Sequence, residues 1–577
     1  MRSNEVPMSD LKSGSLKVNA HIRCRSSKLQ RWWMSSGSRI KSILIFGACS
    51  GPDPAAVIIS SGDRLLHGGT SRVKLQKKLS DAGCTGMEAI YPIDGLFSDQ
   101  IAALLSPPPT PEVEKYFEDL TSSRRCDGLK VKLNGEYGKG VFAEKNFKEG
   151  ELVLKDKMLV GAQHTSNKMN CLVCSYCFRF IGSIEHQIGR QLFWLDFGIP
   201  TDDCEGKELS HTKRDFCNSP HSDEAGSSGK ELQENGGCSS SSSRPKVSIP
   251  KDLLHSLMNG DTLLPYSEHF PLPSIVPCPG ACEESYYCSP ACAHADWEEF
   301  HSLLCTGKGS KALSTEALLK FIEHANETND IFLPAAKVIS FTILRYRKFK
   351  ADWISGKGKY DTSVKSAFSL LLEAWKPVSM GHKKCWWGCV DLPNDIEHSD
   401  EAAFRMLIKE LADESLQLLK AAIFDHELFS LEIYGHIIGM FELNNLDLIV
   451  ESPLVNYFKH IDDLPSLEKR EAEQIIRPIL DAHGDEYSTC CQGTAFFPLQ
   501  SCMNHSCKPN AKAFKREEDL DGDAIIIALE PIQKGEEITI SYIDEDLPIE
   551  ERQELLADYG FRCKCPKCLE ETIEGVN

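Results

Sequence analysis

The chain has 577 residues, 41% of them apolar and 26% charged, as in ordinary globular proteins, and its length suggests three or four domains. This composition excludes collagen-like and wholly disordered chains, and no apolar run reaches the ~18 residues that a membrane-spanning helix needs. The formal net charge is −20, although residues 1–80 carry 14 Lys and Arg against 4 Asp and Glu. The acidic remainder argues against broad binding of nucleic-acid phosphates and favours a basic substrate or partner.

The first part of the chain is predicted to be separable from the rest. Residues 1–125 are expected to form a basic, disordered extension, with a stiff Pro-rich linker at 106–111. A transit peptide has the same composition as the first 80 residues, so an organellar signal stays open. No apolar signal-peptide segment is recognisable, so we expect an intracellular chain, in which clustered cysteines indicate zinc ligands rather than disulfides.

The rest of the chain alternates between strand and helix patterns. A helical stretch at ~312–480 places Phe404, Leu407, Leu411, Leu418 and Ala422 on one apolar stripe, which we interpret as core. A Ser-rich segment at 226–243 is expected to be a disordered loop. Short strands with glycine punctuation are predicted on both sides of the helices, at 129–133, 138–143, 151–154, 524–529 and 537–542.

Residues 171–305 hold a dense set of cysteines and one well-spaced histidine. Ligand pairs separated by two or three residues form turns that present both side chains to one zinc ion, and eight ligands make two closed, structural sites. Cys171 competes with Cys174 for the first pair, whereas Cys385 and Cys389 lack a partner pair nearby and are interpreted as core. The four predicted pairs are Cys174 and Cys177, Cys278 and Cys282, Cys288 and Cys292, and His301 and Cys305.

This pattern resembles the MYND zinc finger, in particular at Tyr287–Cys292 and His301–Cys305, with Trp297 between them. It departs from the family in the ~100 residues between the first and second pairs and in the three-residue spacing of the second pair. The resemblance implies two interleaved sites in a lobe that recruits partners. One site would use Cys174, Cys177, Cys288 and Cys292, and the other Cys278, Cys282, His301 and Cys305.

Three further segments resemble, in order, the SET domain of protein lysine methyltransferases. They are Gly138–Ala143, the Asn504–Asn510 segment with the letters NHSCKPN, and Gly535–Tyr542, which is followed by a Cys-x-Cys-x2-Cys tail. Together with the finger, they make the chain similar to the SET-and-MYND methyltransferases, and among them to the plant trithorax-related protein two subgroup. The chain ends soon after the tail, so we expect part of the substrate-side wall either to come from the helices of 306–480 or to be absent.

The resemblance implies an enzyme that uses S-adenosylmethionine to methylate a protein lysine. Tyr542 would be the catalytic residue at the end of the lysine channel, where its hydroxyl orients the amine and also contacts the cofactor. The other implied cofactor-binding residues are Lys139, Ser501, Asn504, His505, Tyr559 and Phe561. The implied third zinc site uses Cys507, Cys563, Cys565 and Cys568, so three zinc ions are expected in all.

The fold class is accordingly predicted to be α+β, a β-rich SET core with a zinc-finger insertion, an all-helical insertion and a zinc-binding post-SET tail. The predicted divisions are the extension at 1–125, the SET core at 126–165 and 486–548, the finger at 166–310, the helical insertion at 311–485 and the tail at 549–577.

By the same resemblance, the expected substrate is a basic protein, most simply a histone tail, and the expected location is the nucleus. The finger would bind Pro-containing partner segments or transcription factors, and no membrane partner is expected. Two alternatives stay open: a catalytically weak scaffold that recruits partners to chromatin, and a methyltransferase of a non-histone cytosolic protein. The acidic run after Tyr542, which includes Asp544 and Asp546, suits a basic peptide or is simply a solvated helix start.

Overall fold

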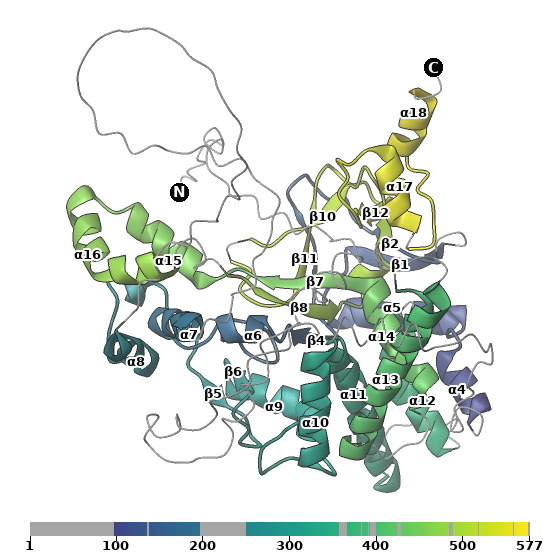
Figure 1. The fold of residues 1–577 in the computed structure, drawn as a ribbon. Helices are drawn as coiled ribbons and strands as arrows, with labels where there is room; N and C mark the ends of the chain where they lie inside the picture. Colours follow the sequence, from purple (N-terminus) through teal and green to yellow (C-terminus); the bar gives the residue numbers. More distant parts are fainter. Residues whose placement is uncertain are drawn as a thin grey trace, which may run out of the picture.

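The computed structural model describes most of the chain from residue 97 onward (Figure 1). The predicted basic segment up to residue 96 and the Ser-rich stretch at 226–243 lie outside the described residues. Among the described helices, none combines the length and hydropathy that crossing a lipid bilayer requires. The described ranges are 97–134, 138–196, 250–356, 366–381, 384–390, 392, 400–423, 429–483, 489–516, 518–557 and 559–574.

Within the described residues, two helices, α4 (Ser98–Leu105) and α5 (Thr110–Ser123), precede strand β1. The chain is therefore ordered and helical here, where the sequence led us to expect a disordered extension as far as residue 125. The reason is that a few apolar residues recur at helical spacing within a polar segment, and tertiary packing holds the helices through them. The buried residues are Ile101 and Leu104 in α4, and Val113, Phe117 and Thr121 in α5.

Two sheets form the centre of the predicted SET core. The first has the order β1-β2-β12-β9, with β12 antiparallel to β2 and parallel to β9, and the second has the order β10-β11-β3. The predicted strands at 129–133, 138–143, 151–154, 524–529 and 537–542 all appear, with shifts of one or two residues at half of their ends. The strands are β1 (Leu129–Asn134), β2 (Gly138–Ala143), β3 (Leu152–Asp156), β9 (Asn504–His505), β10 (Ala511–Ala513), β11 (Ala524–Ala528) and β12 (Glu537–Ile540).

A third sheet joins the core to the rest of the molecule. Its order is β4 (Val160–Gln163), β8 (Cys491–Phe496) and β7 (Asn445–Val450), all antiparallel. β7 corrects the expectation that 311–485 is entirely helical. Its residues Leu446, Leu448 and Val450 are buried at a spacing of two, the period of a strand rather than of a helix.

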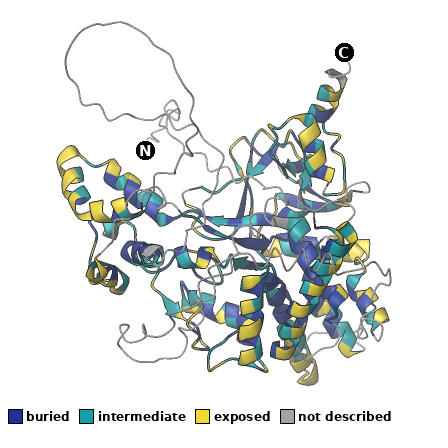
Figure 2. Ribbon diagram, in the orientation of Figure 1, coloured by how far each residue is buried: buried dark blue, intermediate teal, exposed yellow. Residues whose placement is uncertain are grey.

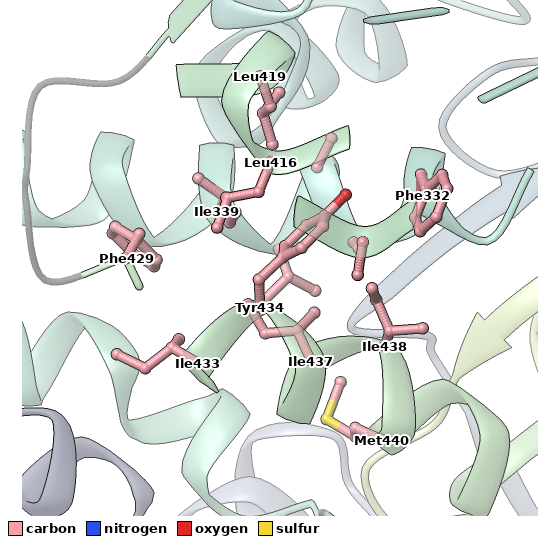
Figure 3. Packing of buried hydrophobic residues seen from close by; sticks show 14 of the residues in the cluster. Phe332, Ile339, Leu416, Leu419, Phe429, Ile433, Tyr434, Ile437, Ile438 and Met440 are labelled. Carbon is pink, nitrogen blue, oxygen red and sulfur yellow. The ribbon is translucent and has the colours of Figure 1, made fainter. Parts of the chain in front are cut away.

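The helical insertion forms the largest hydrophobic core. Figure 3 shows its centre, where Tyr434 of α14 is surrounded by side chains that include Phe332 and Leu416. The Tyr434 hydroxyl lies 2.9 Å from the Ser415 hydroxyl, so this buried polar group is satisfied. The helices are α10 (Thr315–Glu327), α11 (Phe332–Ile354), α12 (Ala367–Ser379), α13 (Glu401–Ile423), α14 (Leu431–Asn444), α15 (Pro453–Asp462) and α16 (Ser466–His483).

A smaller lobe combines helices from two predicted domains. α7 (Ile184–Asp196) and α8 (Lys251–Asn259) pack with α15 and α16 around a separate core that includes Leu257 and Tyr457. Figures 1 and 2 show this lobe at the left, with one face of α16 exposed.

The predicted finger packs against the body rather than forming a detached lobe. Residues Val173, Phe178 and Phe180 share a core with β7 and β8. The backbone N–H of Gly522, just before β11, donates to the Cys177 carbonyl at 2.8 Å. The remaining elements of the finger and tail are α6 (Asn167–Asn170), β5 (Val276–Pro277), β6 (Tyr286–Tyr287), α9 (Pro290–Glu299), α17 (Ile549–Ala557) and α18 (Pro566–Glu574).

Candidate active site and metal centres

The pairing of β9 with β12 brings two distant sequence segments together. Asn504 lies opposite Thr539 and His505 opposite Ile540, in parallel register. Asn510 reinforces the pairing, because its side chain donates to the Glu537 carbonyl at 2.8 Å and accepts from the Thr539 N–H at 2.9 Å. The chain leaving β12 therefore passes directly beside His505.

Tyr542 is fixed at both ends by the Met503–His505 segment. Its backbone N–H donates to His505 Nδ1 at 3.0 Å, and its hydroxyl donates to the Met503 carbonyl at 2.5 Å. Burial raises the pKa of the Tyr542 phenol, so the hydroxyl keeps its proton at neutral pH. The hydroxyl hydrogen is thus occupied, and the lone pairs of the oxygen remain able to accept a hydrogen bond.

Aromatic rings surround this tyrosine. The Tyr542 ring centroid lies 5.4 Å from that of His505, 5.2 Å from that of Tyr559 and 6.5 Å from that of Phe561. The His505 and Phe561 rings are 6.0 Å apart. Four of the residues predicted to form the site are therefore adjacent, although up to 56 positions separate them along the chain.

The side chain of Asn504 lies close to the backbone of β2 at Gly140. Its Nδ2 donates to Glu537 Oε1 at 2.7 Å. A Cβ at Gly140 would lie 2.6 Å from the same Glu537 oxygen and 3.3 Å from Asn504 Nδ2, so any larger residue here would displace the Glu537 carboxylate that Asn504 binds.

Lys139 and Ser501 make contacts within the protein. The Lys139 ammonium donates to the Met380 carbonyl, just after α12, and lies 5.7 Å above the Phe117 ring. The Ser501 hydroxyl donates to the Pro498 carbonyl at 3.2 Å. Both residues are half-buried on segments next to Asn504, and their predicted contacts with the cofactor stay predictions.

These residues suit S-adenosylmethionine on chemical grounds. The aromatic group offers stacking faces for an adenine and for a sulfonium cation. The side-chain Oε1 of Gln500 is buried and has no hydrogen-bond partner within the described residues, so an acceptor is available beside Ser501.

Twelve predicted ligands gather in three quartets, and within each quartet the ligand atoms lie within 4.8 Å of one another. Soft thiolates in groups of four are the donor set that structural zinc sites use. The quartets are Cys174, Cys177, Cys288 and Cys292; Cys278, Cys282, His301 and Cys305; and Cys507, Cys563, Cys565 and Cys568.

One thiol in each quartet has a lowered pKa because a neighbouring thiol donates a hydrogen bond to it. Hydrogen bonding by Cys177, Cys305 and Cys507 respectively lowers the pKa of Cys174, Cys282 and Cys563, and the same bonds raise the pKa of the three donor thiols. Thiolate is the form that binds a metal, so the donor sets fit three zinc ions.

The cysteines left open by the sequence lie elsewhere. Cys171 is buried against the third sheet, with its Sγ 3.5 Å from the Thr489 carbonyl, and belongs to none of the three quartets. Cys385 and Cys389 flank the short turn that buries Trp386 and are themselves only half-buried, so they lie at the edge of the core rather than in it.

The tail quartet is connected directly to the candidate active site. Cys507 lies two residues beyond His505, and its Sγ is 3.2 Å from His505 Nε2. Arg552 of α17 is buried, with its guanidinium 3.8 Å from Cys568 Sγ and paired with Glu571. This cation offsets the negative charge of the thiolates, because each thiolate site gathers several negative charges in one place.

Sequence reasoning missed several residues that support the site. Glu537 belongs to the glycine-glutamate motif, but its bond to Asn504 could not be foreseen without the register of β9. Arg552 has no sequence signal beyond a charged position in a short helix. Asn510 was within the recognised motif, and its bridging role depends on the fold.

Comparisons with known proteins agree with this geometry. The family model for the SET domain matches residues 387–543, and that for the MYND finger matches residues 273–305. These matches leave the predicted first SET segment and the Cys174 and Cys177 pair outside their bounds.

Relatives align over most of the chain. It is 59% identical over 489 residues to the histone-lysine N-methyltransferase ATXR2 of Arabidopsis thaliana, which covers 84% of this chain and 99% of that protein. It is 26% identical over 460 residues to the protein-lysine N-trimethyltransferase SMYD5 of Gallus gallus, covering 76% of this chain and 84% of that protein. The human SMYD5 protein is 23% identical over 453 residues, covering 76% and 85%.

Proposed function

The chain belongs to the SET-and-MYND family of protein-lysine methyltransferases, and from this premise we propose that it methylates lysines of histone tails in the nucleus. The observation that carries the histone assignment is the 59% identity to a relative named as a histone-lysine methyltransferase, along nearly that relative's whole length.

The proposed chemistry depends on a neutral lysine amine. The ordinary pKa of lysine is about 10.4, and an apolar channel lowers it by disfavouring the charged form. S-adenosylmethionine supplies the methyl group when bound. The Tyr542 hydroxyl donates its hydrogen to the Met503 carbonyl, so its oxygen can accept a hydrogen bond from the lysine amine. This bond points the lone pair of the amine nitrogen at the methyl group to be transferred. Asn504, His505, Tyr559 and Phe561 bind and orient the cofactor in this proposal.

The acidic segment after Tyr542 supports a basic peptide substrate. Asp546, Glu550 and Glu551 are exposed at the start of α17. Negative charge beside the exit of the lysine channel would attract the cationic residues that flank a lysine in a histone tail, and salt would weaken that attraction.

The finger, a protein-interaction module, would bind Pro-containing segments of transcription factors and so bring the enzyme to chromatin. Peptide binding measured by fluorescence anisotropy would test this, with Cys288→Ser as the variant in which the finger loses its metal.

A second substrate class has its own support. The SMYD5 relatives are named as protein-lysine trimethyltransferases without reference to histones. A non-histone protein is therefore the alternative substrate, and the number of methyl groups transferred is a separate question.

The test is a methylation assay with the full chain, labelled S-adenosylmethionine, and either histone octamers or a cell-lysate pool, read by mass spectrometry. We expect lysine methylation in the octamers and none with Tyr542→Phe. Methylation confined to lysate proteins would favour the second class, and no methylation of either would contradict the enzyme assignment for this chain.

A further inference from the structure

One fully buried carboxylate joins three parts of the SET core. Asp156, the last residue of β3, is 0% exposed. Its Oδ2 accepts from the backbone N–H groups of Leu499 at 2.8 Å and Gln500 at 2.9 Å. Its Oδ1 accepts from the guanidinium of Arg124, which directly follows α5 and is 19% exposed.

The two N–H groups belong to the turn that leads into the cofactor segment. Gln500 opens the short helix Gln500–Cys502, and Asn504 lies two residues beyond the end of that helix. The carboxylate accepts hydrogen bonds from two successive backbone N–H groups, so it fixes the position and direction of the backbone that leads to Asn504. Burying a charge is costly unless it is paired and hydrogen-bonded, and here both conditions are met.

We propose that Asp156 is a positioning residue that sets the 499–505 segment for cofactor binding, and that Arg124 keeps it ionised for this purpose. The inference rests on the proposed function only in taking Asn504 and His505 as cofactor-binding residues. It also makes the segment just after α5 a necessary part of the catalytic unit.

The ionisation of Asp156 separates positioning from simple stabilisation. Burial raises the pKa of Asp156 to about 6, and Arg124 and the two amides oppose that rise. A carboxyl whose pKa is raised in the folded state lowers folding stability as it ionises with rising pH. Ionisation of Asp156 at neutral pH therefore does not stabilise the fold, and its charge needs another role. The other ionisable groups around it are Tyr116, Cys126, Cys502 and Asp523.

The sign of the pH effect on binding follows. Above pH 6 the ionised carboxylate holds both amides and Arg124, so its contribution to cofactor affinity is present. As the pH falls through about 6 that contribution is lost. An asparagine should behave like the protonated acid at every pH.

The experiment measures the affinity of the full chain for S-adenosylhomocysteine by calorimetry between pH 5 and pH 8. Asp156→Asn should bind about tenfold more weakly than the parent at pH 8 and equally at pH 5. Its thermal transition should fall, because the neutral amide cannot satisfy Arg124 and both backbone amides, so the pH profile of the affinity is the readout of positioning. Asp521→Asn is the matched control, because that carboxylate pairs at 2.8 Å with Lys155 of the same strand on the surface.

Arg124 provides a second, milder test if Asp156→Asn does not fold. Arg124→Gln should move the midpoint of the affinity profile to higher pH, whereas Arg124→Lys should keep it near that of the parent. Amide exchange of Leu499 and Gln500 should speed up in Asp156→Asn without any ligand.

The outcomes distinguish this inference from the proposed function. A parent protein that does not bind S-adenosylhomocysteine would contradict the proposed function. A parent that binds, with Asp156→Asn binding equally at pH 8 or with an unmoved midpoint in Arg124→Gln, would overturn the positioning role.

Discussion

The finger and the tail hold the same kind of thiol-rich quartet but are built into the molecule differently. The finger quartets sit beside the third sheet and the helical body, through Val173 and Phe178 on one side and the stacked rings of Phe300 and Phe341, 5.6 Å apart, on the other. The tail quartet is enclosed by two short helices and takes Cys507 from the segment that carries His505.

This difference separates two consequences of metal loss. Loss from the finger should loosen a wall of the body that lies away from Tyr542. Loss from the tail should release Cys507 and Phe561, which are in contact with or adjacent to His505. The same ligand chemistry therefore supports stability in one region and site geometry in the other.

The largest expected effect comes from a residue that contacts the tail but binds no metal. Tyr542→Phe removes the hydroxyl and keeps the ring, so we expect turnover to fall by at least ~100-fold. Zinc content should not change, and the free energy of unfolding should fall only by about 1 kcal/mol for the lost hydrogen bond to the Met503 carbonyl. Single-turnover rates, elemental analysis and denaturant unfolding measure these three quantities, and near-normal turnover would mean that the chemistry does not depend on this hydroxyl.

The direct comparison is Cys507→Ser against Cys288→Ser. Each removes one thiolate from a quartet, but only Cys507 borders His505. We expect Cys507→Ser to weaken S-adenosylhomocysteine binding by about tenfold or more, and Cys288→Ser to act mainly by lowering the thermal transition. Calorimetry and circular dichroism on both variants check this, and equal losses of affinity would remove the distinction between the two regions.

Metal stoichiometry sharpens the same comparison. Three quartets predict three zinc ions per chain. The tail site is closed by the small cluster around Ile543 and Leu556, so under mild chelation we expect its ion to leave first and cofactor affinity to fall with it. Elemental analysis during graded chelation measures this, and two ions or fewer in metal-replete protein would contradict the count.

Local patterns made part of this architecture predictable. The spacing of the cysteine pairs predicts which ligands can share a turn, whereas the grouping of the twelve ligands into three sites followed from the resemblance to the MYND finger and the SET domain. The strands at 129–133 and 537–542 were likewise visible as short apolar alternations between glycine turns. In both cases the determining residues are neighbours in the sequence.

What the sequence could not supply depends on partners far along the chain. α5 looked disordered because only Val113, Phe117 and Thr121 mark its buried face, and their partners are strands of the core. β7 was hidden in a helical stretch, since three alternating apolar residues are too few to outweigh the helices around them. Asp156 gave no signal, because its role depends on amides 343 and 344 positions away.

The smallest expected effect tests the contact between finger and core. At Gly522, which donates to the Cys177 carbonyl, a Cβ would lie 2.7 Å from side-chain atoms of both Leu448 and Met158 and 3.1 Å from Phe178. These atoms belong to the wall that the finger shares with β7. Gly522→Ala should therefore overpack this wall and lower the free energy of unfolding by about 1–3 kcal/mol.

The matched control for Gly522→Ala is Gly388→Ala, because a Cβ at Gly388 meets nothing within 4 Å. We expect Gly388→Ala to leave stability nearly unchanged, and both variants to keep the affinity of the parent for S-adenosylhomocysteine. Denaturant unfolding and calorimetry provide the two readouts. If Gly522→Ala weakened cofactor binding in proportion to its loss of stability, strain at the finger would reach the site through β11 and β3. The finger and the tail would then be energetically coupled rather than independent.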